Sequence, residues 1–233
     1  VFSSTGRFLA EYGGPGEAPG ELLSVGDLAV MGDGVIVVTD PRAGEFEFFH
    51  PDTGYIGALM GFTHRVPSTV DADGDLIVGR RELFDRRTGS SGEALAGWSR
   101  NSTEPVVVYT EEWSRFDPGR MASRLMAPEP PMEVSGSLVF YAPPDHESYR
   151  ILAFDGSGAA PRTISRPGYT PVRKTQEELD EEMELFEERR RQMVGMGRGG
   201  AAMLSAEYAP GEFHFAVISL GSDAEGRLWA RRG

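Results

Sequence analysis

A phrase that the chain nearly repeats first reads Val1-Phe2-Ser3-Ser4-Thr5-Gly6-Arg7-Phe8-Leu9: a strand, a glycine turn and a second strand. Related versions begin near Phe48, Leu83 and Leu152, each with an aromatic residue or an aspartate before a turn. Glycine supplies the backbone angles that tight turns need, so each copy predicts a β-hairpin.

A second repeated phrase lies between these copies and has two short apolar strands around a turn rich in Asp and Gly. It occurs at 28–38, 69–78 and 220–229. One hairpin of each kind makes a four-stranded antiparallel unit, and a unit of about 40 residues that recurs along a chain is typical of a β-propeller blade. The sequence therefore predicts an all-β chain with propeller architecture.

The composition excludes several kinds of partner and chemistry. The 233 residues carry 36 acidic and 23 basic side chains, giving a net charge of −13. No nucleic-acid partner is expected, because binding a phosphate backbone needs a basic surface. The chain has no cysteine, which excludes disulfides, thiolate metal sites and thiol catalysis. No apolar run approaches the ~20 residues needed to span a bilayer, so no transmembrane segment is expected in this stretch.

The hairpins group into predicted blades of unequal length. The expected blades are 1–13 (outer hairpin only), 26–61, 66–98, 132–166 and 213–232 (inner hairpin only), with a strand at 106–109 added outside the third. We interpret 1–233 as a single propeller domain that is incomplete at both ends, with roughly four blades' worth of chain present.

Residues 167–211 interrupt the series of predicted hairpins with one helix and a Gly-rich link. Thr175 and Glu178 have the spacing of a capping box, and the helix is expected over 175–193, with arginines 189–191 at its end to match the helix dipole. Its apolar stripe includes Phe186. The helix would either pack this stripe on a neighbouring blade or cover the face that binds the ligand.

The chain resembles the six-bladed β-propellers of the NHL type, in particular the exported bacterial group. The residues that carry the likeness lie at 6–9, 16–22, 35–40, 149–155 and 226–229. The resemblance implies a periplasmic or extracellular location and a scaffold that hosts binding, hydrolysis or lyase chemistry in different members.

The candidate binding residues follow the strand ends that would line one mouth of a propeller. They are Asp40, Arg42, His64, Arg80, Arg81, Asp145, His146, Arg231 and Arg232. The guanidinium group suits carboxylate or phosphate, so a small anionic ligand or an acidic segment of a protein is the predicted partner. Alternatively, these arginines are solvated charges paired with nearby acids.

The favoured function is non-catalytic binding of a ligand or protein at the bacterial cell envelope, with no cofactor. The alternative is a metal-assisted hydrolase or lyase of the lactonase or amidating-lyase propeller type, which would need converging carboxylate or histidine ligands. Asp71, Asp73 and Asp75 begin like a calcium loop, but Leu76 stands where that motif needs glycine, so a hairpin turn is expected instead. No Gly-x-Ser-x-Gly motif supports a serine nucleophile.

Overall fold

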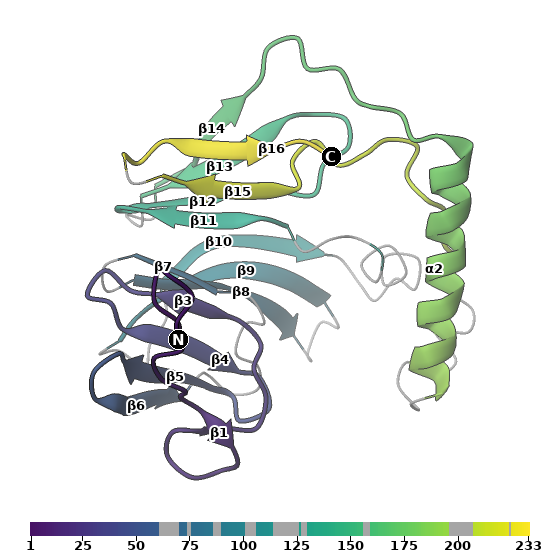
Figure 1. The fold of residues 1–233 in the computed structure, drawn as a ribbon. Helices are drawn as coiled ribbons and strands as arrows, with labels where there is room; N and C mark the ends of the chain where they lie inside the picture. The colour runs from purple at the N-terminus through teal and green to yellow at the C-terminus, as the bar shows by residue number, and fades with distance from the viewer. Residues whose placement is uncertain are drawn as a thin grey trace. The chain divides into compact units, whose positions relative to one another are not determined.

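The structure is a computed structural model, and it describes residues 1–60, 70–73, 76–85, 90–100, 106–113, 126, 130–155, 159–195, 207–223 and 225–233. This part of the chain consists mainly of antiparallel strands, with one long helix (Figure 1). The prediction of an all-β chain with an inserted helix is confirmed. No helix in the described ranges is long and apolar enough to cross a membrane.

The first sheet has four antiparallel strands in chain order. They are β3 (Leu28–Val30), β4 (Ile36–Asp40), β5 (Glu45–His50) and β6 (Gly54–Met60). Gly34, in the turn before β4, and Gly54, the first residue of β6, have φ angles of 84° and 78°, where a side chain would be strained. Apolar and acidic residues alternate along β5, so the two faces of the sheet differ. The predicted strands at 26–61 are confirmed.

The second sheet differs from its prediction in two ways. Its strands are β7 (Val70–Asp73), β8 (Leu76–Asp85), β9 (Ser90–Ser99) and β10 (Val106–Trp113). The prediction ended this sheet at Trp98 and placed 106–109 outside it, but β10 pairs with β9 as the fourth strand. Strand β8 also continues past Val78, because its residues through Asp85 pair with β9.

The third sheet again has four antiparallel strands in chain order. They are β11 (Met132–Ser135), β12 (Leu138–Tyr141), β13 (Arg150–Phe154) and β14 (Arg162–Ser165). A two-stranded antiparallel sheet follows near the C-terminal end, formed by β15 (Ser219–Ser222) and β16 (Leu228–Arg231). Both agree with the hairpins predicted at 132–166 and 213–232.

Shorter elements precede the first sheet. Phe2 and Phe8 form an isolated antiparallel bridge at the predicted first hairpin. Strands β1 (Gly14–Pro15) and β2 (Glu21–Leu22) then pair in parallel. Leu22 and the ring of Tyr12 pack with Val38 and Phe49. Residues 12–22 therefore lie against the face of the first sheet that also carries Glu45 and Glu47.

The chain divides into two compact units. The first comprises Val1–Ser114, Val134–Val139 and Asp155–Gly158, and the second comprises Arg115–Glu133, Phe140–Phe154 and Ala159–Gly233. In the first unit, Phe46 and Phe48 pack with Ile77, Ala96 and Trp98 in one core cluster. Residues of the first two sheets thus share a core.

In the second unit, helix α2 (Gln176–Gly195) carries the predicted capping box. The backbone N–H of Thr175 donates to Glu178 Oε2 at 2.7 Å, and the N–H of Glu178 donates to Thr175 Oγ1 at 3.3 Å. The N–H and the hydroxyl of Thr175 both donate to the Glu178 carboxylate, and these two bonds lower the pKa of Glu178. The helix continues past the arginines expected at its end, and its last turn has no basic residue. Phe186 of the apolar stripe is buried against Tyr208 and Met126.

We expect Thr175→Ala to lower the free energy of unfolding by about 1 kcal/mol, because it leaves a helical N–H without its acceptor. Urea titration followed by circular dichroism at 222 nm measures this loss. Thr170→Ala, in an exposed loop position, is the matched control and should change stability by less than about 0.5 kcal/mol. Equal losses in the two variants would contradict a capping role.

Candidate binding site

Asp40, the first predicted binding residue, is a buried anchor of the local backbone. Its side chain is 1% exposed. One carboxylate oxygen accepts the N–H of Leu23 at 2.6 Å, and the other accepts the N–H groups of Arg42 and Ala43 at 3.0 Å each. Burial raises its pKa, but hydrogen bonds from Ala43, Ser24 and Leu23 outweigh this and the pKa is lowered overall. The carboxylate of Asp40 is therefore already bound by backbone N–H groups close to it.

Asp145, in the second unit, also accepts hydrogen bonds from nearby backbone N–H groups. Its carboxylate accepts the N–H groups of Glu147 and Ser148 at 2.9 and 2.8 Å, and it also accepts the Ser148 hydroxyl. Arg150 lies 4.0 Å away. Burial acts to raise the pKa of Asp145, but the bonds from Ser148 and Glu147 and the charge of Arg150 lower it overall. The residue organises the loop before β13.

His146 fixes the next segment of the second unit. Its Nδ1 lies 2.6 Å from the carbonyl oxygen of Phe213, and its ring lies 4.0 Å from the Phe215 ring centroid to centroid. A Cβ atom at Gly211 would approach the His146 ring to 3.2 Å. The imidazole is thus held between two stretches of backbone and a phenyl ring, which favours a positioning role.

The remaining candidates of the first unit are not assembled into a site in the described structure. Arg42 is exposed in the turn after β4. Arg80 and Arg81 were expected directly after a strand, but they lie within β8, opposite Leu95 and Ala94 of β9. Pairing with β9 extends the strand through them. His64 lies outside the described residues.

Arg231 and Arg232 are exposed at the end of β16. The guanidinium of Arg232 lies over the ring of Tyr169, 5.5 Å from its centroid. Tyr169 in turn lies 5.9 Å from Tyr149, centroid to centroid. A cation held against an aromatic face contributes about 0.5–1 kcal/mol at an exposed site, which favours this position of the Arg232 side chain.

Tyr169 is positioned by a turn whose sequence signal was not used in the prediction. The segment runs Arg166-Pro167-Gly168-Tyr169, and the N–H of Tyr169 donates to the carbonyl of Arg166 at 3.2 Å. Gly168 has a φ angle of 70°. Proline followed by a glycine with positive φ is the pattern of a type II turn. The turn brings Tyr169 back beside the start of the β13–β14 hairpin, where Arg150 pairs with Ser165.

We call Tyr149, Arg150, Arg166, Tyr169 and Arg232 the Arg–Tyr patch. Its three arginines are exposed and its tyrosines are half-buried. Neither Arg166 nor Arg232 has an ion-pair partner within the residues that the structure describes. Arg232 lies over the ring of Tyr169, and Arg166 begins the turn that ends at Tyr169, so the patch gathers basic side chains in a chain with a net charge of −13. Of the predicted residues, only Arg232 belongs to it.

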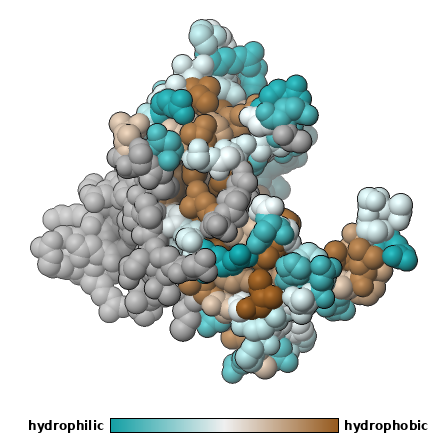
Figure 2. Space-filling model, turned by 90° about the vertical axis from the view of Figure 1, so that its left-hand side faces the viewer, coloured by the Kyte–Doolittle hydropathy of each residue, from teal (hydrophilic) through white to brown (hydrophobic). Residues whose placement is uncertain are grey.

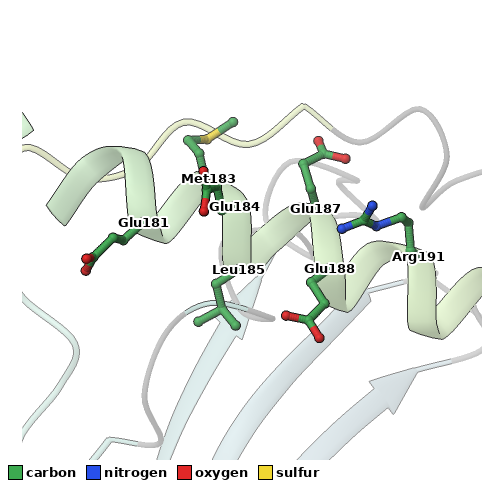
Figure 3. Close-up of a pocket in the computed structure, with 7 residues that line it drawn as sticks. All are labelled: Glu181, Met183, Glu184, Leu185, Glu187, Glu188 and Arg191. Carbon is green, nitrogen blue, oxygen red and sulfur yellow. The ribbon is translucent and has the colours of Figure 1, made fainter. Parts of the chain in front are cut away.

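Helix α2 borders an open pocket of different character. Its volume is about 740 Å³, and seven residues of α2 line it. Glu181, Leu185 and Glu188 point to one side of the helix, whereas Met183, Glu187 and Arg191 point to another (Figure 3). The acidic side chains are largely exposed, so this pocket has no enclosed polar group that would fix a ligand.

Possible metal ligands and exposed apolar side chains also bear on what the described residues can bind. Across the described ranges, no group of three or more histidine, aspartate or glutamate side chains is arranged to hold a metal ion. Apolar side chains reach the surface at several places, as the brown areas of Figure 2 show. They include Phe2, Leu28, Val30 and Trp229, of which Phe2 is 65% exposed.

No protein-family model matches the chain, and no curated protein matches it in sequence. Among solved structures, the chain is similar to hydrazine synthase of Kuenenia stuttgartiensis, with 13% sequence identity and a TM-score of 0.35. The similarity covers 64% of this chain and 38% of that chain. The chain thus spans well under half the length of that protein.

Proposed function

We propose that this chain is part of a β-propeller of the six-bladed NHL type that binds an acidic ligand or protein segment, without catalysis, in the periplasm or outside the cell. The observation that carries the binding function is the Arg–Tyr patch, where Arg166 and Arg232 have no acidic partner among the described residues and Arg232 lies over the ring of Tyr169. Exposed guanidinium groups present paired donors that match a carboxylate.

The propeller architecture rests on the repeated sheets. Three four-stranded antiparallel sheets each have their strands in chain order, and a two-stranded hairpin follows them. This is the strand order of successive propeller blades. The absence of cysteine is compatible with an oxidising compartment, where free thiols would be at risk.

A binding role also fits the way that the other candidate residues are used. The carboxylates of Asp40 and Asp145 accept several backbone hydrogen bonds each. Both have lowered pKa values, so they are poor proton donors or acceptors near neutral pH. Among the described residues, Arg166 and Arg232 remain as exposed arginines without an ion-pair partner.

The test uses a blocked diglutamate peptide as the probe and follows backbone amide shifts by NMR at low salt. We expect the shifts to concentrate at 149–150, 166–169 and 231–232. The double variant Arg166→Gln, Arg232→Gln should weaken binding about tenfold or more, because each charged hydrogen bond contributes roughly 1.5–3 kcal/mol. Raising the salt concentration should also weaken binding, since the sites are exposed.

Arg162→Gln is the matched control, because Arg162 is an exposed arginine at the other end of β14. It should bind the peptide as tightly as the unchanged chain does. Equal binding by the double variant, or shifts spread evenly over the surface, would show that the patch is not the site. Turnover of ester or lactone substrates that depends on an added divalent metal would instead support the hydrolase alternative.

A further inference from the structure

Glu47 is a buried acid in the first sheet that the proposed binding function does not use. Its side chain is 4% exposed, and its Oε2 atom has no hydrogen-bond partner in the described part of the chain. It lies on β5 opposite Val38 of β4 and Ala58 of β6. Leaving a carboxylate oxygen buried and unpaired is costly when the group is charged.

The ionisable groups around Glu47 make that charge still less favourable. Glu45 is two residues away on β5 and therefore on the same face of the sheet. Burial raises the pKa of Glu47 to about 7, and the charges of Glu45 and Asp40 and a hydrogen bond with Glu45 act in the same direction. From β6, Tyr55 faces the pair, and burial and the two glutamates raise its pKa as well.

The face that carries these acids is covered by residues 12–22. Tyr12 and Leu22 pack with Val38 and Phe49, and the Tyr12 hydroxyl donates to the carbonyl of Pro51. A Cβ atom at Gly20 would lie 2.9 Å from Tyr55, so the covering segment is in close contact with β6. Its own ionisable groups are Tyr12, Glu17 and Glu21, which add no positive charge.

We propose that Glu45 and Glu47 share one proton in the folded chain, and that raising the pH toward neutral loosens residues 12–22 from the first sheet. An ionised Glu47 gains stability from water, and the covering segment packs on the face of the sheet that carries Glu47. Glu45 is only half-buried and can keep its charge. The pair would thus make the contact between this segment and the sheet sensitive to pH.

Glu47 should destabilise the folded chain as the pH rises, because folding raises the pKa of its carboxyl group. Folding raises the pKa of Glu47 from 4.5 to about 7, so the stability that it contributes is full below 4.5 and is lost as the pH rises to about 7. Over that interval the equilibrium constant for exposing the carboxyl rises by up to tenfold for each pH unit.

The experiment is hydrogen exchange with mass spectrometry on the whole chain at pH 5.5, 7.0 and 8.5, corrected for intrinsic exchange rates. We expect protection of residues 12–22 to fall about 30-fold between pH 5.5 and 8.5, with most of the fall complete by pH 7.0. In Glu47→Gln this fall should disappear, because the amide has nearly the same shape and does not ionise. Glu11→Gln, at an exposed position, is the control and should keep the fall.

Two further measurements separate a shared proton from a merely structural glutamate. Glu45→Gln removes a like charge and should move the midpoint of the protection change to lower pH. In the unchanged chain, the carboxyl carbon of Glu47 should titrate near neutral pH by NMR, a readout that needs no variant to fold. A midpoint near 4.5, or pH dependence that persists in Glu47→Gln, overturns the proposal. So does recovery of protection at pH 8.5 on adding calcium, which would show that the pair holds a cation.

Discussion

Trp98→Ala is expected to lower the free energy of unfolding of the first unit by about 4 kcal/mol. Removing a large buried aromatic side chain loses its transfer free energy and leaves a cavity, which together cost about 3–5 kcal/mol. Trp98 is 1% exposed, and its ring meets Phe46 edge to face at 5.1 Å between centroids. It packs in the cluster shared by the first and second sheets, so both sheets should lose stability together.

Urea denaturation followed by far-ultraviolet circular dichroism measures the loss without relying on tryptophan fluorescence. Trp229→Ala is the matched control, because Trp229 is 62% exposed. It should cost less than about 1 kcal/mol, chiefly through the hydrogen bond from its indole N–H to Asp223. If the two variants lost equal stability, the cluster around Trp98 would not be the core that the structure shows.

Asp40→Ala is expected to cost about 3 kcal/mol or more at pH 7. The substitution leaves the partly buried N–H groups of Leu23, Arg42 and Ala43 without their acceptor. A buried donor without an acceptor costs about 1–3 kcal/mol, and a donor that water can reach costs less. Asp52→Ala, at an exposed turn position, is the control and should cost less than about 1 kcal/mol.

The same residue should give the unchanged chain part of its sensitivity to acid. Folding lowers the pKa of Asp40 below 3.8, so its contribution to stability is present above 3.8 and is lost as the pH falls through the folded value. Urea midpoints measured from pH 7 to 2.5 should therefore decline less steeply at the acid end in Asp40→Ala. A parallel decline in both proteins would show that Asp40 is not stabilised as a carboxylate.

The first sheet was predictable from sequence because its signals are local. Alternation along Glu45–His50 and turn glycines such as Gly34 and Gly54 mark strands and their ends within a few residues. The second sheet was harder for the opposite reason. Arg80 and Arg81 look like the end of a strand, but pairing with β9 carries β8 through to Asp85. The length of β8 is set by pairing with β9, which the short stretch of sequence around Arg80 does not include.

The candidate site was predicted only in part. The sequence indicated exposed arginines near the C-terminal end, and Arg232 does lie in the Arg–Tyr patch. It did not indicate that Tyr149 and Tyr169 would meet there, because that contact depends on a turn and a hairpin that are far apart from Arg232 in the sequence. Asp40 and Asp145 were expected to face a ligand, whereas the structure shows that nearby backbone groups hold their carboxylates.

Strand order has a consequence for how such a chain can change over evolutionary time. Each four-stranded sheet is formed by one continuous stretch of sequence, with every strand paired to its neighbour along the chain. A stretch of this kind can be duplicated or deleted without altering the pairing inside the remaining sheets. The number of four-stranded sheets is therefore freer to vary than the strand pairing inside each sheet. Individual sheets can diverge at surfaces such as the Arg–Tyr patch, because the residues of that patch lie outside the repeated pattern.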